Sequence, residues 1–227
     1  MGQLNRQVLG RVSGKIGDIV FRQRAGKNFA SVKPDSINVS DDPASIDRRN
    51  RFALACKFSS HINAVPYLSP IWKKKTPAGL SAYNYITKIN YMFTEPDELS
   101  DLASLVPGLG FGVTVNSSAL IPPNLNVVID PIGSISGIDT AAEPVMRLCT
   151  IISLTNPNDE YIDRAEFITL VSGDQAAVLD APLTFQVPYS SQETQLFNSY
   201  QDKKAFSVLV SLDQDENPVH YSNTILL

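Results

Sequence analysis

Residues 19–32 read IVFRQRAGKNFASV, and residues 43–65 read PASIDRRNRFALACKFSSHINAV. The first segment has two β-prone runs around Gly26, a residue that tolerates the positive φ of a tight turn, so it predicts a β-hairpin. The second contains no proline or glycine after Pro43, so it predicts one long helix. These two elements favour an α+β fold, and neither contains a residue pattern typical of a reaction centre.

The predicted hairpin sorts its side chains onto two chemically different faces. If Ala25 and Gly26 form the turn, Phe21 lies opposite Ala30 on an apolar face, while the other face is basic. A two-stranded ribbon is marginally stable alone, so its apolar face has to cover either the helices of its own chain or a neighbouring subunit. The candidate interface comprises Ile19, Phe21, Arg22, Arg24, Lys27, Phe29 and Val32.

The predicted helix begins at Pro43, after a run of capping oxygens in residues 40–42, and ends before Pro66. Its apolar residues recur at steps of three and four positions and therefore share one face: Phe52, Ala55, Phe58, Ile62 and Val65. Arg51 projects near this face, and Asp47 lies one helical turn before it. We predict a structural ion pair between Asp47 and Arg51, and the alternative is that Arg51 reaches an anionic ligand.

The charged residues are distributed unevenly along the chain of 227 residues, whose net charge is −4. Residues 1–75 contain 14 Lys and Arg against 5 Asp and Glu, a net charge of +9, whereas residues 76–227 contain 5 against 18, a net charge of −13. Such a division favours either an anionic partner for the basic part or head-to-tail contact between copies of the chain.

After this helix, the sequence predicts first a second helix and then a series of β-strands. Thr76-Pro77 predicts the start of a second helix, and the run Lys73-Lys74-Lys75 before it is interpreted as a solvated loop, with a phosphate-backbone contact as the alternative. Residues 107–110 are turn-rich and mark the predicted domain boundary. The β-prone runs that follow predict an antiparallel β-sandwich; they are 111–115, 124–130, 145–154, 165–171, 176–179, 183–187, 206–212 and 220–226. We therefore expect a basic hairpin-and-helix module at 1–106 and an acidic β-sandwich domain at 107–227.

No catalytic, cofactor-binding or metal-binding motif is complete in this sequence. The run Gly10-Arg11-Val12-Ser13-Gly14-Lys15 is close to a phosphate-binding loop, but only three residues separate its glycines where four are needed. The only histidines are His61 and His220, too few for a histidine-rich metal site. We therefore expect a protein that is not an enzyme, with no cofactor, no metal and no small-molecule substrate.

The sequence also bears on the compartment. No apolar stretch has the form of a signal peptide or the length of a membrane span. Cys56 and Cys149 lie far apart in the sequence, and without an export signal they are expected to be free, buried thiols rather than a disulfide. We expect a virion or cytoplasmic protein with no membrane partner.

The front half of the chain contains a pattern of glycine, proline and apolar residues at fixed spacings. They are Leu9-Gly10-x-x-Ser13-Gly14-Lys15-Ile16-Gly17-x-Ile19-Val20, Gly26-Lys27, Pro34, Pro43 and Arg49-x-x-Phe52-Ala53, with a looser match at Ala82-x-Asn84 and at 220–226. In this order the chain resembles an uncharacterised family that is common in Bacteroidota and in their phages. The chain departs from the family at residues 21–24, where an aromatic-lysine-glycine turn is usual. The resemblance implies no activity; it implies an N-terminal hairpin-and-helix module, an immunoglobulin-like β domain and association with phage structural genes.

These observations together favour a non-enzymatic structural subunit of a virion or a similar large assembly, which associates with itself through the basic N-terminal module. The expected partners are further copies of the chain and other structural subunits. The alternative is a nucleic-acid-binding protein that uses the basic N-terminal half, and for nucleic acid we expect at most weak, non-specific binding.

Overall fold

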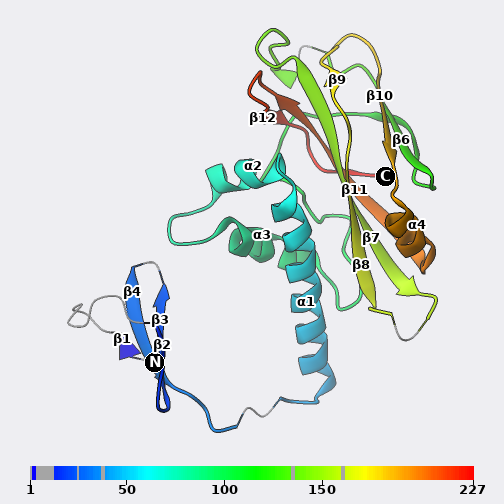
Figure 1. The fold of residues 1–227 in the computed structure, drawn as a ribbon. Helices are drawn as coiled ribbons and strands as arrows, with labels where there is room; N and C mark the ends of the chain where they lie inside the picture. Colours follow the sequence, from blue (N-terminus) through cyan, green and yellow to red (C-terminus); the bar gives the residue numbers. More distant parts are fainter. Residues whose placement is uncertain (1, 4–12, 25, 37–38, 134–135, 160–161) are drawn as a thin grey trace. The chain divides into compact units, whose positions relative to one another are not determined.

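The computed structural model describes residues 2–3, 13–24, 26–36, 39–133, 136–159 and 162–227 (Figure 1). The chain forms two compact units, Met1–Ser45 and Ile46–Leu227. Ala25, one member of the predicted turn pair, and residues 10–12 of the incomplete phosphate-loop motif lie outside the described residues. The N-terminal unit is an antiparallel sheet, and the second unit, which we call the body, combines helices with two antiparallel sheets, so the α+β class is confirmed.

The sheet of the N-terminal unit has four strands in the order β1-β4-β3-β2. Their bounds are Gly2–Gln3 for β1, Gly14–Ile16 for β2, Ile19–Arg24 for β3 and Lys27–Val32 for β4. Ile19 pairs with Val32 and Phe21 with Ala30, so the predicted hairpin register is confirmed. Strand β2 was not predicted; it joins β3 through a turn at Gly17-Asp18, where Gly17 has a φ of 57°.

Helix α1 spans Pro43–Ala64 and begins as predicted, because Asp42 Oδ2 accepts a hydrogen bond from the Ser45 amide at 3.2 Å. Its buried stripe consists of Leu54, Ala55, Phe58, Ser59 and Ile62. Phe52, which was predicted to belong to this stripe, is 56% exposed, because it lies to the side of the stripe, where it forms an edge-to-face pair with Tyr91, with 6.4 Å between the ring centres. The prediction for Phe52 is therefore wrong, while the other four residues of the predicted apolar face are buried.

The helices after α1 differ from the prediction in number and position. Helix α2 spans Leu68–Lys75, so the three lysines at 73–75 lie in the last helical turn, where the negative end of the helix dipole favours cations, and not in a loop. Helix α3 spans Ala82–Asn90 and is capped by Ser81 rather than by Thr76; the 3₁₀ helix η1, Tyr91–Phe93, follows it. The Trp72 indole is buried and donates a hydrogen bond to the Leu105 carbonyl at 2.8 Å.

The body contains two sheets. The larger has six strands, with β12-β11-β7-β8 as its main order and with β13 and β9 paired to β11 and β7, and the smaller has the order β10-β6-β5. The bounds are β5 Val115–Ala119, β6 Asn124–Ile129, β7 Val145–Pro157, β8 Ala165–Val171, β9 Gln175–Ala176, β10 Leu183–Pro188, β11 Tyr200–Leu212, β12 Pro218–Tyr221 and β13 Ile225–Leu226. Helix α4, Ser191–Asn198, was not predicted, although Ser190 and Glu193 form a capping box before it.

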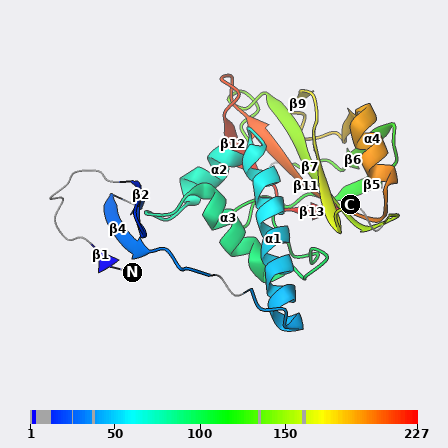
Figure 2. The same cartoon turned by 60° about the horizontal axis from the view of Figure 1, so that its bottom comes forward.

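The six-stranded sheet is covered on both faces, which makes the body a three-layered unit. One face packs against α1, α2, α3 and residues 99–106, and the other packs against the three-stranded sheet and α4 (Figures 1 and 2). Residues 148–154 of β7 are consequently buried without interruption, since both of their faces are covered. The structure thus groups the chain differently from the predicted division at residue 106, because the helices share their hydrophobic core with β7, β8 and β11.

Candidate functional site

The N-terminal sheet carries a row of large aliphatic side chains that face solvent. Ile16 pairs with Ile19, and Ile19 pairs with Val32, so the three lie side by side across β2, β3 and β4. Their exposed fractions are 68%, 44% and 73%. No hydrophobic residue among those described in the N-terminal unit is buried. We call these three residues the apolar row; the sheet that bears it has no apolar core of its own within the part of the unit that is described.

The opposite face of the same sheet is basic, because side chains alternate between the two faces of a strand. Lys15 pairs with Val20, and Arg22 pairs with Phe29. Lys15, Arg22 and Lys27 are exposed, and Phe29 is half-buried. None of the three cations forms an ion pair with another described residue. We call these four residues, Lys15, Arg22, Lys27 and Phe29, the basic face.

The predicted interface residues thus all belong to one sheet, divided between its two faces. The register also pairs Arg24 with Lys27, so two cationic residues occupy opposite positions at the end of the ladder. Sequence reasoning missed Lys15 and Ile16. The signal for them was Gly17-Asp18 between two β-prone residues, a two-residue hairpin turn that brings β2 beside β3.

Arg51 does not pair with Asp47 in the structure, so the predicted ion pair is wrong. The guanidinium carbon of Arg51 lies 4.8 Å from the centre of the Tyr91 ring, and its Nε is buried without a hydrogen-bond partner. Asp47 is exposed. The ring face attracts the cation and leaves the Asp47 carboxylate in water, where it is better solvated. The contact joins α1 to η1 within the body.

Lys57 connects α1 with the start of β8. Its Nζ lies 2.8 Å from Glu166 Oε2 and 3.0 Å from Asp163 Oδ2, and it donates a further hydrogen bond to the Ala165 carbonyl. Burial by itself would lower the pKa of Lys57, but the hydrogen bonds and charges of Glu166 and Asp163 outweigh it, so the pKa is raised. One turn along, His61 Nδ1 lies 2.9 Å from Thr169 Oγ1, and burial lowers the pKa of the imidazole. These contacts hold the helix on the sheet.

Glu143, Ser211 and His220 form a hydrogen-bonded polar cluster in the body. Glu143 is 3% exposed, accepts a hydrogen bond from the Ser211 hydroxyl and lies 2.9 Å from His220 Nδ1. The residue types are those of a hydrolytic triad, but the serine bonds to the carboxylate instead of the imidazole and is fully buried. A substrate cannot reach this hydroxyl, so the cluster fixes the loop before β7 to β11 and β12.

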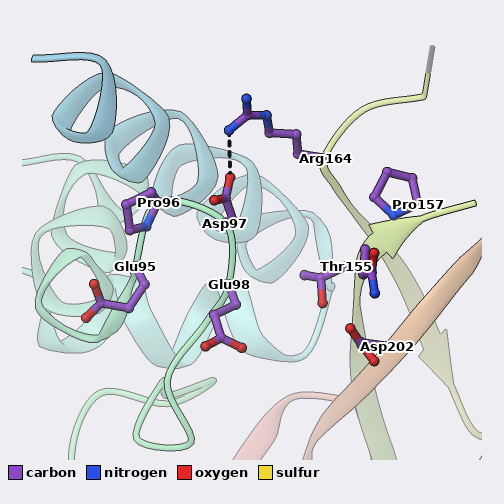
Figure 3. Close-up of a pocket in the computed structure, with 9 residues that line it drawn as sticks. Glu95, Pro96, Asp97, Glu98, Thr155, Pro157, Arg164 and Asp202 are labelled. Carbon is purple, nitrogen blue, oxygen red and sulfur yellow. Dashed lines mark hydrogen bonds and ion pairs between the residues drawn. The ribbon is translucent and has the colours of Figure 1, made fainter. Parts of the chain in front are cut away.

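A cleft of about 500 Å³ opens between the loop at 95–98 and the ends of β7 and β11 (Figure 3). Four of the nine residues that line it are acidic, namely Glu95, Asp97, Glu98 and Asp202, and Arg164 donates a hydrogen bond to Asp97 at 3.1 Å. Carboxylates on an exposed wall are solvated, and among the described residues no group of three or more His, Cys, Asp or Glu is placed to hold a metal ion. The cleft is therefore a concave surface whose described residues form no metal site.

The two cysteines do not form a disulfide. Cys56 and Cys149 are both free thiols; Cys56 is half-buried, and burial raises the pKa of Cys149 to about 12. None of the helices that the structure describes combines the length and the apolar composition needed to cross a bilayer.

No protein-family model matches the chain, and no curated protein was found to be similar to it. The resemblance of the front half to a phage-associated family therefore stays a prediction.

Proposed function

We propose that the chain is a non-enzymatic structural subunit of a large protein assembly, and that copies of it associate through the N-terminal sheet. The observation that carries this proposal is the apolar row, Ile16, Ile19 and Val32, in a unit whose described residues include no buried hydrophobic residue. The resemblance to phage-associated proteins favours a virion as the assembly. For the body we propose an immunoglobulin-like β-sandwich, supported by two antiparallel sheets that pack through one hydrophobic cluster.

The N-terminal unit is small, at 45 residues. A chain segment of about 40 residues rarely buries enough apolar surface to be stable alone, and such units usually depend on oligomerisation, metals or disulfides. A buried aliphatic side chain contributes about 1.5–3 kcal/mol relative to an exposed one, so covering the apolar row would stabilise the sheet substantially. The row is free of charged side chains, because the cations of β2, β3 and β4 belong to the other face of the sheet or to the end of the ladder.

A second copy of the chain is the partner that the charges favour. Residues 1–45 contain 7 Lys and Arg against 4 Asp and Glu, a net charge of +3, whereas residues 46–227 contain 12 against 19, a net charge of −7, so the N-terminal unit of one copy attracts the body of another. Attraction of this kind speeds and orients the encounter, whereas burial of the apolar row makes the contact last. A head-to-tail contact of this type propagates into a ring or a filament.

The test is the molar mass of the full chain by light scattering after size exclusion, compared with the double variant Ile19→Thr/Val32→Thr. Threonine preserves the β-branched shape that strands favour, so the sheet is retained while its row becomes polar. We expect the wild type to form oligomers and the variant to be a monomer. The matched control is Leu102→Thr/Ile121→Thr, which removes two apolar side chains of the body that are 69% and 74% exposed and should leave the oligomer intact. A wild-type monomer at high concentration would refute the proposal.

A further inference from the structure

The basic face of the N-terminal sheet is a second surface, distinct from the apolar row. Strands β2, β3 and β4 contain no acidic residue, and Lys15, Arg22 and Lys27 are all exposed. In most antiparallel sheets, opposite charges face each other across the ladder and like charges are avoided. Here Arg24 and Lys27 are register partners, so two residues of like charge occupy opposite positions in the ladder. Such an arrangement becomes favourable when an anion lies on the face.

An aromatic residue lies among these cations. Phe29 is the register partner of Arg22, two positions along β4 from Lys27, and it is half-buried rather than enclosed. Neither Phe29 nor the three cations is engaged in an ion pair, ring contact or cation–π contact with a described residue. A positively charged sheet face with an accessible ring is the combination that holds single-stranded nucleic acid, because the cations contact phosphates and the ring stacks with a base.

We propose that the basic face, formed by Lys15, Arg22, Lys27 and Phe29, binds single-stranded nucleic acid without sequence preference. The charge of the face matches a phosphate backbone, and Phe29 distinguishes a nucleic acid from other polyanions, since only a nucleic acid offers bases to stack. A duplex keeps its bases inside the helix, where Phe29 does not reach them. The face is separate from the apolar row, so this binding does not depend on self-association.

The test measures the anisotropy of a labelled oligothymidylate titrated with the full chain. With about three phosphates neutralised, the logarithmic salt slope is about −2, so the affinity falls about 20-fold between roughly 50 and 200 mM salt. An abasic oligonucleotide of the same length has the same phosphates and no bases, and it should bind about tenfold more weakly because stacking is lost. Equal affinity for the two oligonucleotides would overturn the role of Phe29, and the absence of any binding at low salt would overturn the whole proposal.

Variants separate the contributions of charge and stacking. Arg22→Thr/Lys27→Thr should remove most of the binding and make the salt slope shallower by about 1.4, the share of two phosphates. The control Lys73→Thr/Lys75→Thr changes the net charge by the same amount on exposed lysines of α2 and should bind like wild type. Phe29→Leu should bind the thymidylate and the abasic strand equally. If both double variants weaken binding alike, the attraction is diffuse and the basic face is no site.

One further outcome identifies a protein partner instead. If Arg22→Thr/Lys27→Thr leaves oligonucleotide binding unchanged but lowers the molar mass of the oligomer, the face meets the acidic body of another copy, and the nucleic-acid proposal is wrong. Circular dichroism of each variant establishes that the sheet is retained, and the salt slope of the wild type tests the proposal without any variant.

Discussion

Lys57 Nζ on α1 lies 2.8 Å from Glu166 Oε2 on β8. The side chains of Lys57 and Glu166 are 31% and 25% exposed, so this pair is shielded from water more than a typical surface salt bridge. The contact crosses from the helical layer to the six-stranded sheet and lies beside the hydrophobic cluster that joins them. It therefore contributes to the orientation of α1 on the sheet as well as to stability.

Lys57→Ala should lower the free energy of unfolding by about 1–2 kcal/mol, because a half-buried carboxylate and a carbonyl lose a charged donor while partial exposure reduces the effect. The raised pKa of Lys57 gives this contribution a pH dependence. It is fully present below the ordinary lysine pKa of 10.5 and is lost as the pH rises through the higher value of the folded state. Urea denaturation at neutral and strongly alkaline pH measures both effects. Lys88→Ala, at an exposed lysine of α3, is the control and should change stability little.

Gly110 occupies a position where the backbone of the last strands approaches closely. A Cβ at this residue would lie 2.1 Å from the Tyr221 carbonyl oxygen, and the Gly110 amide donates to Asn223 Oδ1 at 2.8 Å. Gly110→Ala should therefore force the two segments apart and destabilise the body by about 1–3 kcal/mol or more. Gly112→Ala, two residues along with nothing within 4 Å of the added carbon, should be nearly neutral. Thermal unfolding of the two variants side by side distinguishes close approach from the loss of glycine flexibility, since equal destabilisation would indicate the latter.

The two cysteines should differ strongly in reactivity. Cys149 is fully buried on β7, and burial raises the pKa of its thiol to about 12, so little thiolate exists near pH 8. Iodoacetamide added to the folded protein should leave Cys149 unmodified, and both thiols should react in denaturant. Mass spectrometry of the Cys56→Ser variant isolates the signal of Cys149. Rapid labelling of that variant under native conditions would show that β7 opens on the timescale of the reaction.

Local sequence patterns predicted the elements that local chemistry determines. The alternation around Gly26 predicted the hairpin register, the capping run before Pro43 predicted the start of α1, and the β-prone run 165–171 coincides with β8. Helix α4 was also predictable, since Ser190 and Glu193 form a capping box. Helix α2 was harder to find, because its eight residues include Pro70 and three lysines, and packing of Trp72 and Ile71 on the core supports it.

The grouping of elements and the partner of Arg51 depended on tertiary contacts. The +9 charge of residues 1–75 suggested one basic module, but burial assigns α1 and α2 to the acidic body, since apolar contact with β7, β8 and β11 outweighs charge in deciding where a helix packs. Likewise the four-residue spacing of Asp47 and Arg51 suits an ion pair, but the partner of Arg51 is Tyr91. Tyr91 is distant in sequence, so no local pattern predicts this contact. The candidate surfaces follow in part from the strand alternation of β3 and β4, which the sequence displays directly. Lys15 and Ile16 join these surfaces through the pairing of β2 with β3, which was not predicted.

Removal of residues 1–34 should convert the oligomer to a monomer without unfolding the body. All buried hydrophobic residues of the described chain lie between Leu54 and Leu212, so the truncation leaves both hydrophobic clusters whole, and Asp42 still caps α1. The thermal midpoint of the truncated protein should therefore match the body transition of the full chain. Its molar mass should be that of one copy at every salt concentration, whereas the full chain should assemble fastest at low salt, where the opposite charges attract most strongly.

The variant Ile19→Thr/Val32→Thr is the control for the length of the deletion. It should also be a monomer, although only two side chains are altered. An oligomer that survives both changes would place the contact on the body, and its exposed side chains at Leu102 and Ile121 would then be the residues to substitute next.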